Sequence, residues 1–205
     1  MLIYTEENKG CKWGIWKMEE TPELLLSQLT NKEDLIRFID TTTSPARVLE
    51  RISVRVLLKT LLGEEKTISY QSNGKPYFED RSVNISISHT KDYVAIILSQ
   101  SPLLGIDIEY TSDRVRRIRS RFISDVEYIN PENETLHLLL HWSAKETMYK
   151  ALSREKIDLK NNFHIKKFIP QNQGYFEAQE TFTEDSLNFR IQYIVTDDYV
   201  VTYTL

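Results

Sequence analysis

A long helical pattern followed by several short strand patterns occurs twice along this chain. The run ARVLERISVRVLLKTLLG, which begins just after Ser44, has apolar residues near helical spacing and ends at Gly63, a typical helix stop. A second helical pattern covers about residues 134–152. The runs after each helix are short, apolar or alternating, and end at turn residues, which is typical of antiparallel strands. This order predicts an α+β fold of two similar lobes, residues 1–110 and 111–205.

The strand patterns can be assigned to the two halves. The N-terminus contains a strand, KWGIWKM, and a helix that begins near Thr21. In the first half the other strand patterns are TISYQSNGKPYF, SVNISISHTKDYVAIILSQ and finally GIDIEY. In the second half they are FHIKKFI, GYFEAQE, NFRIQYIV and YVVTYTL. We therefore expect GIDIEY to close the N-terminal lobe.

Composition excludes several classes of protein. The chain has 205 residues and is 40% hydrophobic, which is enough for a real core, and its net charge of −4 argues against generic nucleic-acid binding. The single cysteine, Cys11, cannot form an internal disulfide, and the first residues contain no apolar run long enough for a signal peptide or membrane helix. The sequence predicts a cytoplasmic protein.

Two acidic residues stand on one face of the predicted strand GIDIEY. Side chains alternate along an extended chain, so Asp107 and Glu109 share one face while Ile106 and Ile108 share the other. Like charges this close repel each other, unless a positive group or water lies between them. A bound divalent cation would turn the repulsion into attraction.

A second charged cluster lies on the predicted helix HWSAKETMYKAL. Glu146, Lys145 and Lys150 fall opposite its mostly apolar arc, and Glu146 and Lys150 have the i, i+4 spacing. Taken alone, this is an exposed ion pair worth a few tenths of a kcal/mol. Together with Asp107 and Glu109, it provides three acids for a cation and two lysines for an anion. Mg²⁺ prefers such carboxylates together with substrate phosphates, so the combination predicts a metal–diphosphate site.

Two further stretches add weaker signals. His89 follows Ser88 at the end of a strand, where its ring N–H can reach a phosphate oxygen, although a histidine at a strand end is more often structural. In NGKPYF, Gly74 permits a close backbone approach and Lys75 provides a cation, although Asn-Gly is also an ordinary hairpin turn.

The motifs in this order resemble a known family. GKP at 74–76, SISHT at 86–90, GIDIE at 105–109, RFISDVEY at 121–128 and WSAKETMYK at 142–150 are similar to the 4′-phosphopantetheinyl transferases, in the long, surfactin-type class. That class folds two lobes related by a pseudo-twofold axis in one chain, which implies an active site in the cleft between them. Because one chain supplies both halves of the cleft, a monomer is expected. The resemblance spans roughly residues 44–160, and the pair GxDxE and WxxKExxxK in this order is its most specific part.

The resemblance implies a reaction and roles for the residues. The activity would be that of a holo-[acyl-carrier-protein] synthase, which moves the phosphopantetheine arm of coenzyme A to a serine of an apo acyl, peptidyl or aryl carrier protein and releases adenosine 3′,5′-bisphosphate. Asp107, Glu109 and Glu146 would bind Mg²⁺, and Glu146 would also take the serine proton. The coenzyme A phosphates and nucleotide would be held by Lys75, Ser88, His89, Lys145, Lys150 and Arg47, with Arg51 and Arg55 as rivals to Arg47.

A basic stretch, DRVRRIRSRF, stands out in this acidic chain. Its arginines form either a solvated surface or a docking patch for an acidic carrier protein, with Val115, Ile118 and Phe122 as apolar anchors between the charges. The arginines in question are Arg114, Arg116, Arg117, Arg119 and Arg121.

Two other functions fit part of the pattern. A Mg²⁺-dependent nucleotide phosphohydrolase would need the same acids and would consume coenzyme A without a carrier protein. An inactive binding module for coenzyme A or a carrier protein need not retain the acids, so the presence of Asp107, Glu109 and Glu146 argues against it.

Overall fold

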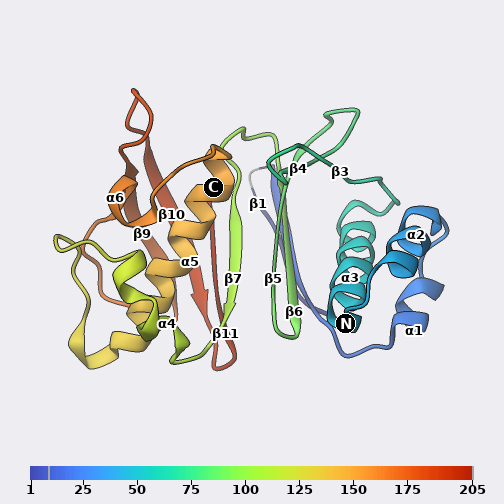
Figure 1. Ribbon diagram of the computed structural model, residues 1–205, viewed down its shortest axis with the longest axis horizontal. Helices are drawn as coiled ribbons and strands as arrows, with labels where there is room; N and C mark the ends of the chain where they lie inside the picture. Colours follow the sequence, from blue (N-terminus) through green and yellow to red (C-terminus); the bar gives the residue numbers. More distant parts are fainter. Residues whose placement is uncertain (9, 205) are drawn as a thin grey trace.

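The protein consists of two antiparallel sheets that lie next to each other, each with a long helix on its other face (Figure 1). The structure is a computed structural model and describes residues 1–8 and 10–204. One sheet has the strand order β1-β2-β6-β5, and the other has the order β7-β11-β10-β9-β8. Helix α3 packs on the first sheet and α5 on the second, so the α+β expectation is confirmed at this level.

The N-terminal sheet and its helices come from the first half of the chain. Its strands are β1 (Leu2–Asn8), β2 (Cys11–Lys17), β5 (Asn84–Thr90) and β6 (Tyr93–Ser99). The helices are α1 (Pro22–Ser27), α2 (Glu33–Thr41) and α3 (Pro45–Leu62). Two short strands, β3 (Ser69–Tyr70) and β4 (Pro76–Tyr77), pair only with each other.

The C-terminal sheet contains β7 (Ile106–Tyr110), β8 (Phe163–Ile165), β9 (Gln173–Glu180), β10 (Asn188–Val195) and β11 (Tyr199–Thr204). Its helices are α4 (Arg114–Arg117), α5 (Glu134–Leu152) and α6 (Leu159–Asn162). Short 3₁₀ turns cover Arg119–Arg121 and Pro131–Asn133.

The apolar alternation of the central strands explains the layers. In β6, Val94, Ile96 and Leu98 belong to the same buried cluster as α3, whereas Ala95 and Ile97 belong to the cluster between the two sheets. A strand buried on both faces has a continuous apolar sequence, as YVAIILS does. Aromatic rings join the sheets directly, since the rings of Trp13 and Tyr203 lie 4.6 Å apart.

The helix ends follow from local chemistry. The Ser44 hydroxyl accepts a hydrogen bond from the backbone N–H of Arg47 at the start of α3, and Gly63 ends the helix in a left-handed conformation with φ 78°. The predicted helix starts near Ser44 and Thr21 are confirmed, as is the range 134–152 for α5.

Strand β7 differs from its prediction. We expected GIDIEY to close the N-terminal lobe, but β7 pairs with β11, so that Asp107 lies opposite Thr202 and Glu109 opposite Val200. Its hydrogen bonds therefore assign β7 to the C-terminal sheet, which begins before the predicted lobe boundary at residue 110. Alternation along a strand predicts which side chains are buried, and Ile106 and Ile108 are indeed buried between the two sheets. It does not predict which strand will be the hydrogen-bonding partner.

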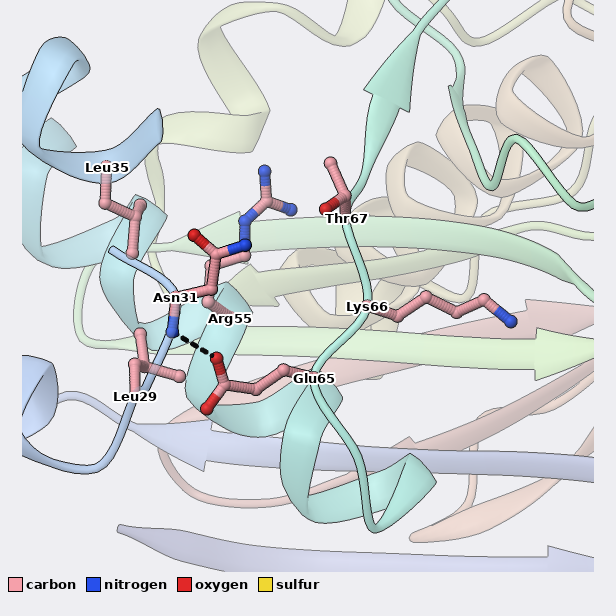
Figure 2. Close-up of a pocket in the computed structure, with 7 residues that line it drawn as sticks. All are labelled: Leu29, Asn31, Leu35, Arg55, Glu65, Lys66 and Thr67. Atoms are coloured by element: carbon pink, nitrogen blue, oxygen red, sulfur yellow. Dashed lines mark hydrogen bonds between the residues drawn. The ribbon is translucent and has the colours of Figure 1, made fainter. Parts of the chain in front are cut away.

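The segment between α1 and α3 was not predicted to contain a helix, but it contains α2. A glutamate after α3 holds the start of this segment. Glu65 accepts a hydrogen bond from the backbone N–H of Asn31 at 2.8 Å (Figure 2). It also accepts one from the backbone N–H of Thr30 at 2.7 Å and pairs with Lys59 at 2.8 Å. Among the described residues, no helix has the length and apolar character needed to span a membrane.

Candidate active site

The site is built where β7 and α5 approach each other unusually closely. A Cβ atom at Gly105, just before β7, would lie 2.1 Å from the backbone oxygen of Thr147 in α5, so only glycine fits there. Buried hydroxyl groups hold α5 to the adjacent strand β11, because the hydroxyl of Thr202 lies 2.7 Å from that of Thr147 and 2.9 Å from that of Ser143. These contacts set the position of α5 relative to the acids on β7.

Asp107 is the most buried acid of the site, with 4% of its surface exposed. Its Oδ1 atom accepts hydrogen bonds from Lys150 Nζ at 2.8 Å and Ser88 Oγ at 2.9 Å. Lys150 also donates to the backbone oxygen of Ile106 at 3.1 Å. Oδ2 of Asp107 is buried and has no hydrogen-bond partner among the described residues. A lysine thus neutralises Asp107 on one side, while its second oxygen has unused acceptor capacity.

Glu109 and Glu146 both lie close enough to Asp107 to be affected by its charge. Burial, followed by the charge of Asp107, raises the pKa of Glu109 to about 7, while the indole N–H of Trp142 opposes this shift with a 2.7 Å hydrogen bond to Oε1. Burial and the charge of Asp107 also raise the pKa of Glu146 to about 7, against the charge of Lys150. The acids predicted from a strand and a distant helix therefore lie in one electrostatic environment.

The donor set suits a hard divalent cation. Carboxylate oxygens are the ligands that Mg²⁺ prefers, and Oδ2 of Asp107 is a buried oxygen without a partner among the described residues. As the side chains lie, no group of three or more His, Cys, Asp or Glu residues in the described part of the chain has the geometry of a metal site. Hydrogen bonds hold Asp107 to Lys150 and Glu109 to Trp142 through one oxygen of each carboxylate, so that Oδ2 of Asp107 and Oε2 of Glu109 are the oxygens left for an ion.

The hydroxyl groups of β5 join the two sheets beside the site. Ser86 accepts a hydrogen bond from the backbone N–H of Ile106 and Thr90 accepts one from that of Tyr110, each at 3.2 Å. Ser88, between them, donates to Asp107. The alternating residues of SISHT thus bond to backbone and side-chain groups of β7, and they bring Ser88 next to Asp107.

Two cavities extend from Lys150 along the N-terminal half. The first is lined by Lys75, Lys150 and Arg154 among other residues, and burial lowers the pKa of Lys75. The second is lined by Arg47 and His89 among others, and it shares Gly74, Pro76 and Ile87 with the first. The structure therefore places Lys75, Arg47 and His89 around two adjacent cavities, the first of which is also lined by Lys150, the partner of Asp107.

Lys145 lies elsewhere, contrary to its predicted role at a diphosphate. Its side chain is 0% exposed, donates to Glu127 Oε2 at 2.8 Å and also donates to the backbone oxygen of Phe122. Lys145 and Lys150 point to different sides of α5, because a spacing of five residues does not bring two side chains to the same face of a helix. Lys145 is buried because α5 is buried on most of its circumference. Lys145 is thus the buried partner of Glu127.

Some arginines of the basic stretch are already engaged in ion pairs within the protein. Arg116 and Arg119 both pair with Glu134, at 3.0 and 2.7 Å. Of the predicted apolar anchors, Phe122 is wrong, because it is fully buried in the core of the C-terminal half. Val115 and Ile118 pack in and against the same core and also line a groove. Val126, a few residues after this stretch in the sequence, is a large apolar side chain with 83% of its surface exposed.

Three side chains around the site were not singled out for a role by the sequence. Trp142 holds Glu109, and Asn73 donates to both the backbone oxygen and the hydroxyl of Ser153, which ties the NGKP turn to the end of α5. Arg154 lines the same cavity as Lys75. Trp142 lies one helical turn before Glu146, and this spacing was the signal that could have identified it.

Comparisons with known proteins agree with this geometry. Residues 103–204, which contain β7, α5 and the C-terminal sheet, match the model of the 4′-phosphopantetheinyl transferase superfamily. A protein of Haemophilus influenzae named "Putative 4'-phosphopantetheinyl transferase" is 26% identical over 160 residues, which cover 65% of this chain and 68% of that protein. The part of this chain that carries β7 and α5 is therefore similar to the 4′-phosphopantetheinyl transferase superfamily.

Proposed function

We propose that this protein transfers 4′-phosphopantetheine from coenzyme A to a serine of an apo carrier protein in a Mg²⁺-dependent reaction. One observation carries the proposal. Asp107, Glu109 and Glu146, from a strand and a distant helix, lie within electrostatic range of one another beside Lys150. The superfamily match over the segment that contains all four residues supports it.

Binding of coenzyme A would use the cavity beside Lys150. Lys150, Lys75 and Arg154 place three cations around one cavity, which suits a diphosphate. Arg47 and His89 in the adjoining cavity would contact the remaining phosphate and the nucleotide. The ring of His89 is half-exposed, with Nδ1 3.5 Å from Glu50, so it remains accessible to a ligand.

Asp107, Glu109 and Glu146 would hold Mg²⁺, which would neutralise charge on the diphosphate as it reacts. The serine oxygen forms a bond to the phosphorus of the pantetheine phosphate, and the bond to the leaving phosphate breaks, so that adenosine 3′,5′-bisphosphate departs. Glu146 takes the serine proton. A carboxylate within hydrogen-bond reach of a hydroxyl group can accept its proton during attack.

The test is incubation of the protein with coenzyme A, Mg²⁺ and a panel of apo carrier proteins, read by intact mass. The proposal predicts that at least one carrier gains a single phosphopantetheine group, and that a serine-to-alanine carrier gains none. Cleavage of coenzyme A without carrier modification would indicate the phosphohydrolase. Binding of coenzyme A without turnover of either kind would indicate the inactive binding module.

A further inference from the structure

Trp142 makes a directed contact with one of the three acids. Its indole Nε1 donates a hydrogen bond to Glu109 Oε1 at 2.7 Å, and the pair joins α5 to β7. An indole N–H is only a donor, and a bond of this length to a carboxylate is among the stronger hydrogen bonds in proteins. The contact therefore fixes the orientation of the Glu109 carboxylate.

The indole itself is held in place. Its ring packs edge-on against Phe122, with ring centroids 5.3 Å apart and an interplanar angle of 68°, and Phe122 is fully buried. Trp142 also lines a groove beside Glu109 together with Val115, Ile118 and Leu139. A donor on a rigid aromatic side chain loses little conformational freedom when it binds a carboxylate.

We propose that Trp142 is a positioning residue of the cation site, which fixes Oε1 of Glu109 so that Oε2 is presented to Mg²⁺. This inference rests on the proposed function, since that proposal makes Glu109 a ligand. Hydrogen-bond partners of metal ligands typically contribute about 10–100-fold to metal affinity. Trp142 thus acts through Glu109 and does not contact the transferred group.

The chain contains a matched control. Trp16, in the N-terminal half, also donates its indole N–H to a glutamate, Glu20, at 3.3 Å. Replacing either tryptophan by phenylalanine removes one indole–carboxylate hydrogen bond and keeps an aromatic ring. Only the substitution at 142 touches an acid of the site.

The experiment is calorimetric titration of Mg²⁺ into the protein preloaded with coenzyme A, for the unmodified chain, Trp142→Phe and Trp16→Phe. The proposal predicts Mg²⁺ affinity at least about tenfold weaker for Trp142→Phe and unchanged for Trp16→Phe. It also predicts that in the transfer assay the KM for Mg²⁺ rises by a similar factor, while kcat at saturating Mg²⁺ changes by less than about twofold.

The outcomes separate the two proposals. If the unmodified protein with coenzyme A bound no Mg²⁺, the proposed function itself would fail. If it bound Mg²⁺ and Trp142→Phe bound it equally well, only the positioning role would be overturned. If Trp142→Phe did not fold, β-(3-benzothienyl)alanine at position 142 would replace it, because this residue keeps the shape of tryptophan and lacks the N–H. Full Mg²⁺ affinity in that variant would also refute the role.

Discussion

Asp107 lies between a lysine and two other acids, and its charge affects all three. It accepts a hydrogen bond from Lys150 at 2.8 Å and raises the pKa of both Glu109 and Glu146. Its removal would therefore change both the ligand set and the protonation of the remaining acids. The first prediction concerns this residue.

Asp107→Asn keeps the shape of the side chain and removes its charge. We expect transfer activity to fall by at least about 100-fold, the upper end of what outer-shell partners of a metal contribute. The fold should remain intact, because a repulsive neighbour of Glu109 and Glu146 has been removed and Lys150, which loses its ion-pair partner, is 26% exposed and can be solvated. The checks are the transfer rate over a range of Mg²⁺ concentrations and the urea midpoint, and full transfer at ordinary Mg²⁺ would refute the ligand assignment.

The second prediction tests whether Lys145 serves as the buried partner of Glu127. Lys145→Met leaves Glu127 buried without its cation, which typically costs about 3–5 kcal/mol. Urea unfolding should detect this loss, whereas the KM for coenzyme A of the folded fraction should stay unchanged. An unchanged free energy of unfolding with a raised KM for coenzyme A would instead support the prediction from the sequence that Lys145 binds the diphosphate.

Among the elements, the contact between β7 and α5 determines the geometry of the site. Gly105→Ala would place a methyl group 2.1 Å from the backbone oxygen of Thr147, so the helix and the strand must separate. Such overpacking costs about 1–3 kcal/mol or more. Gly174→Ala is the matched control, since its Cβ would meet only the Tyr193 side chain at 3.2 Å. We expect a larger loss of stability and of transfer at position 105, and equal effects at both positions would contradict the account.

The link between α3 and the segment before α2 should depend on pH. Hydrogen bonds from Lys59 and the N–H groups of Asn31 and Thr30 lower the pKa of Glu65 from 4.5 to about 2. Because the folded pKa is depressed, the unfolded chain takes up the proton first. The stabilisation is therefore full above pH 4.5 and is lost as the pH falls toward 2.

The measurement is the urea midpoint of the unmodified chain and of Glu65→Gln across this pH range. The difference between them should shrink steadily from pH 4.5 to 2. A difference that stayed constant with pH would show that the Glu65 carboxylate does not stabilise the fold through its charge.

Local signals predicted the helices better than they predicted the sheets. Ser44 and Gly63 specify the ends of α3 through hydrogen bonding and backbone conformation, which are short-range effects. The partner of β7 depends on contacts with β11, about 90 residues later in the chain, and alternation carries no information on it. The burial of Lys145 likewise depends on Glu127, which the helix pattern alone does not reveal.

For the whole molecule, the site lies where the two halves meet. Ser88 comes from the N-terminal sheet, Asp107 from the C-terminal sheet and Lys150 from α5, and they form one set of hydrogen bonds. One chain thus supplies both sides of the site, which supports the proposals of two lobes and of a functional monomer. The pseudo-twofold relation of the lobes stays a prediction.

Carrier docking is a question at the scale of the molecular surface. Arg116 and Arg119 are paired with Glu134, so exposed Arg117 is the cleaner position for a test of the proposed patch. Arg117→Glu should raise the KM for carrier protein several-fold and leave that for coenzyme A unchanged, because complementary charge mainly accelerates association. Arg190→Glu, another exposed position in the C-terminal half, is the control. Equal effects of Arg117→Glu on both KM values would indicate a solvated surface.

The central claim is that acids from β7 and α5 share one cation. The most direct measurement is a crystal structure with coenzyme A and Mn²⁺ in place of Mg²⁺, read by anomalous scattering. The account predicts one strong peak, with oxygen atoms of Asp107, Glu109 and Glu146 as its ligands. A peak bound by residues of only one of these elements, or a fully bound coenzyme A with no peak at all, would contradict it.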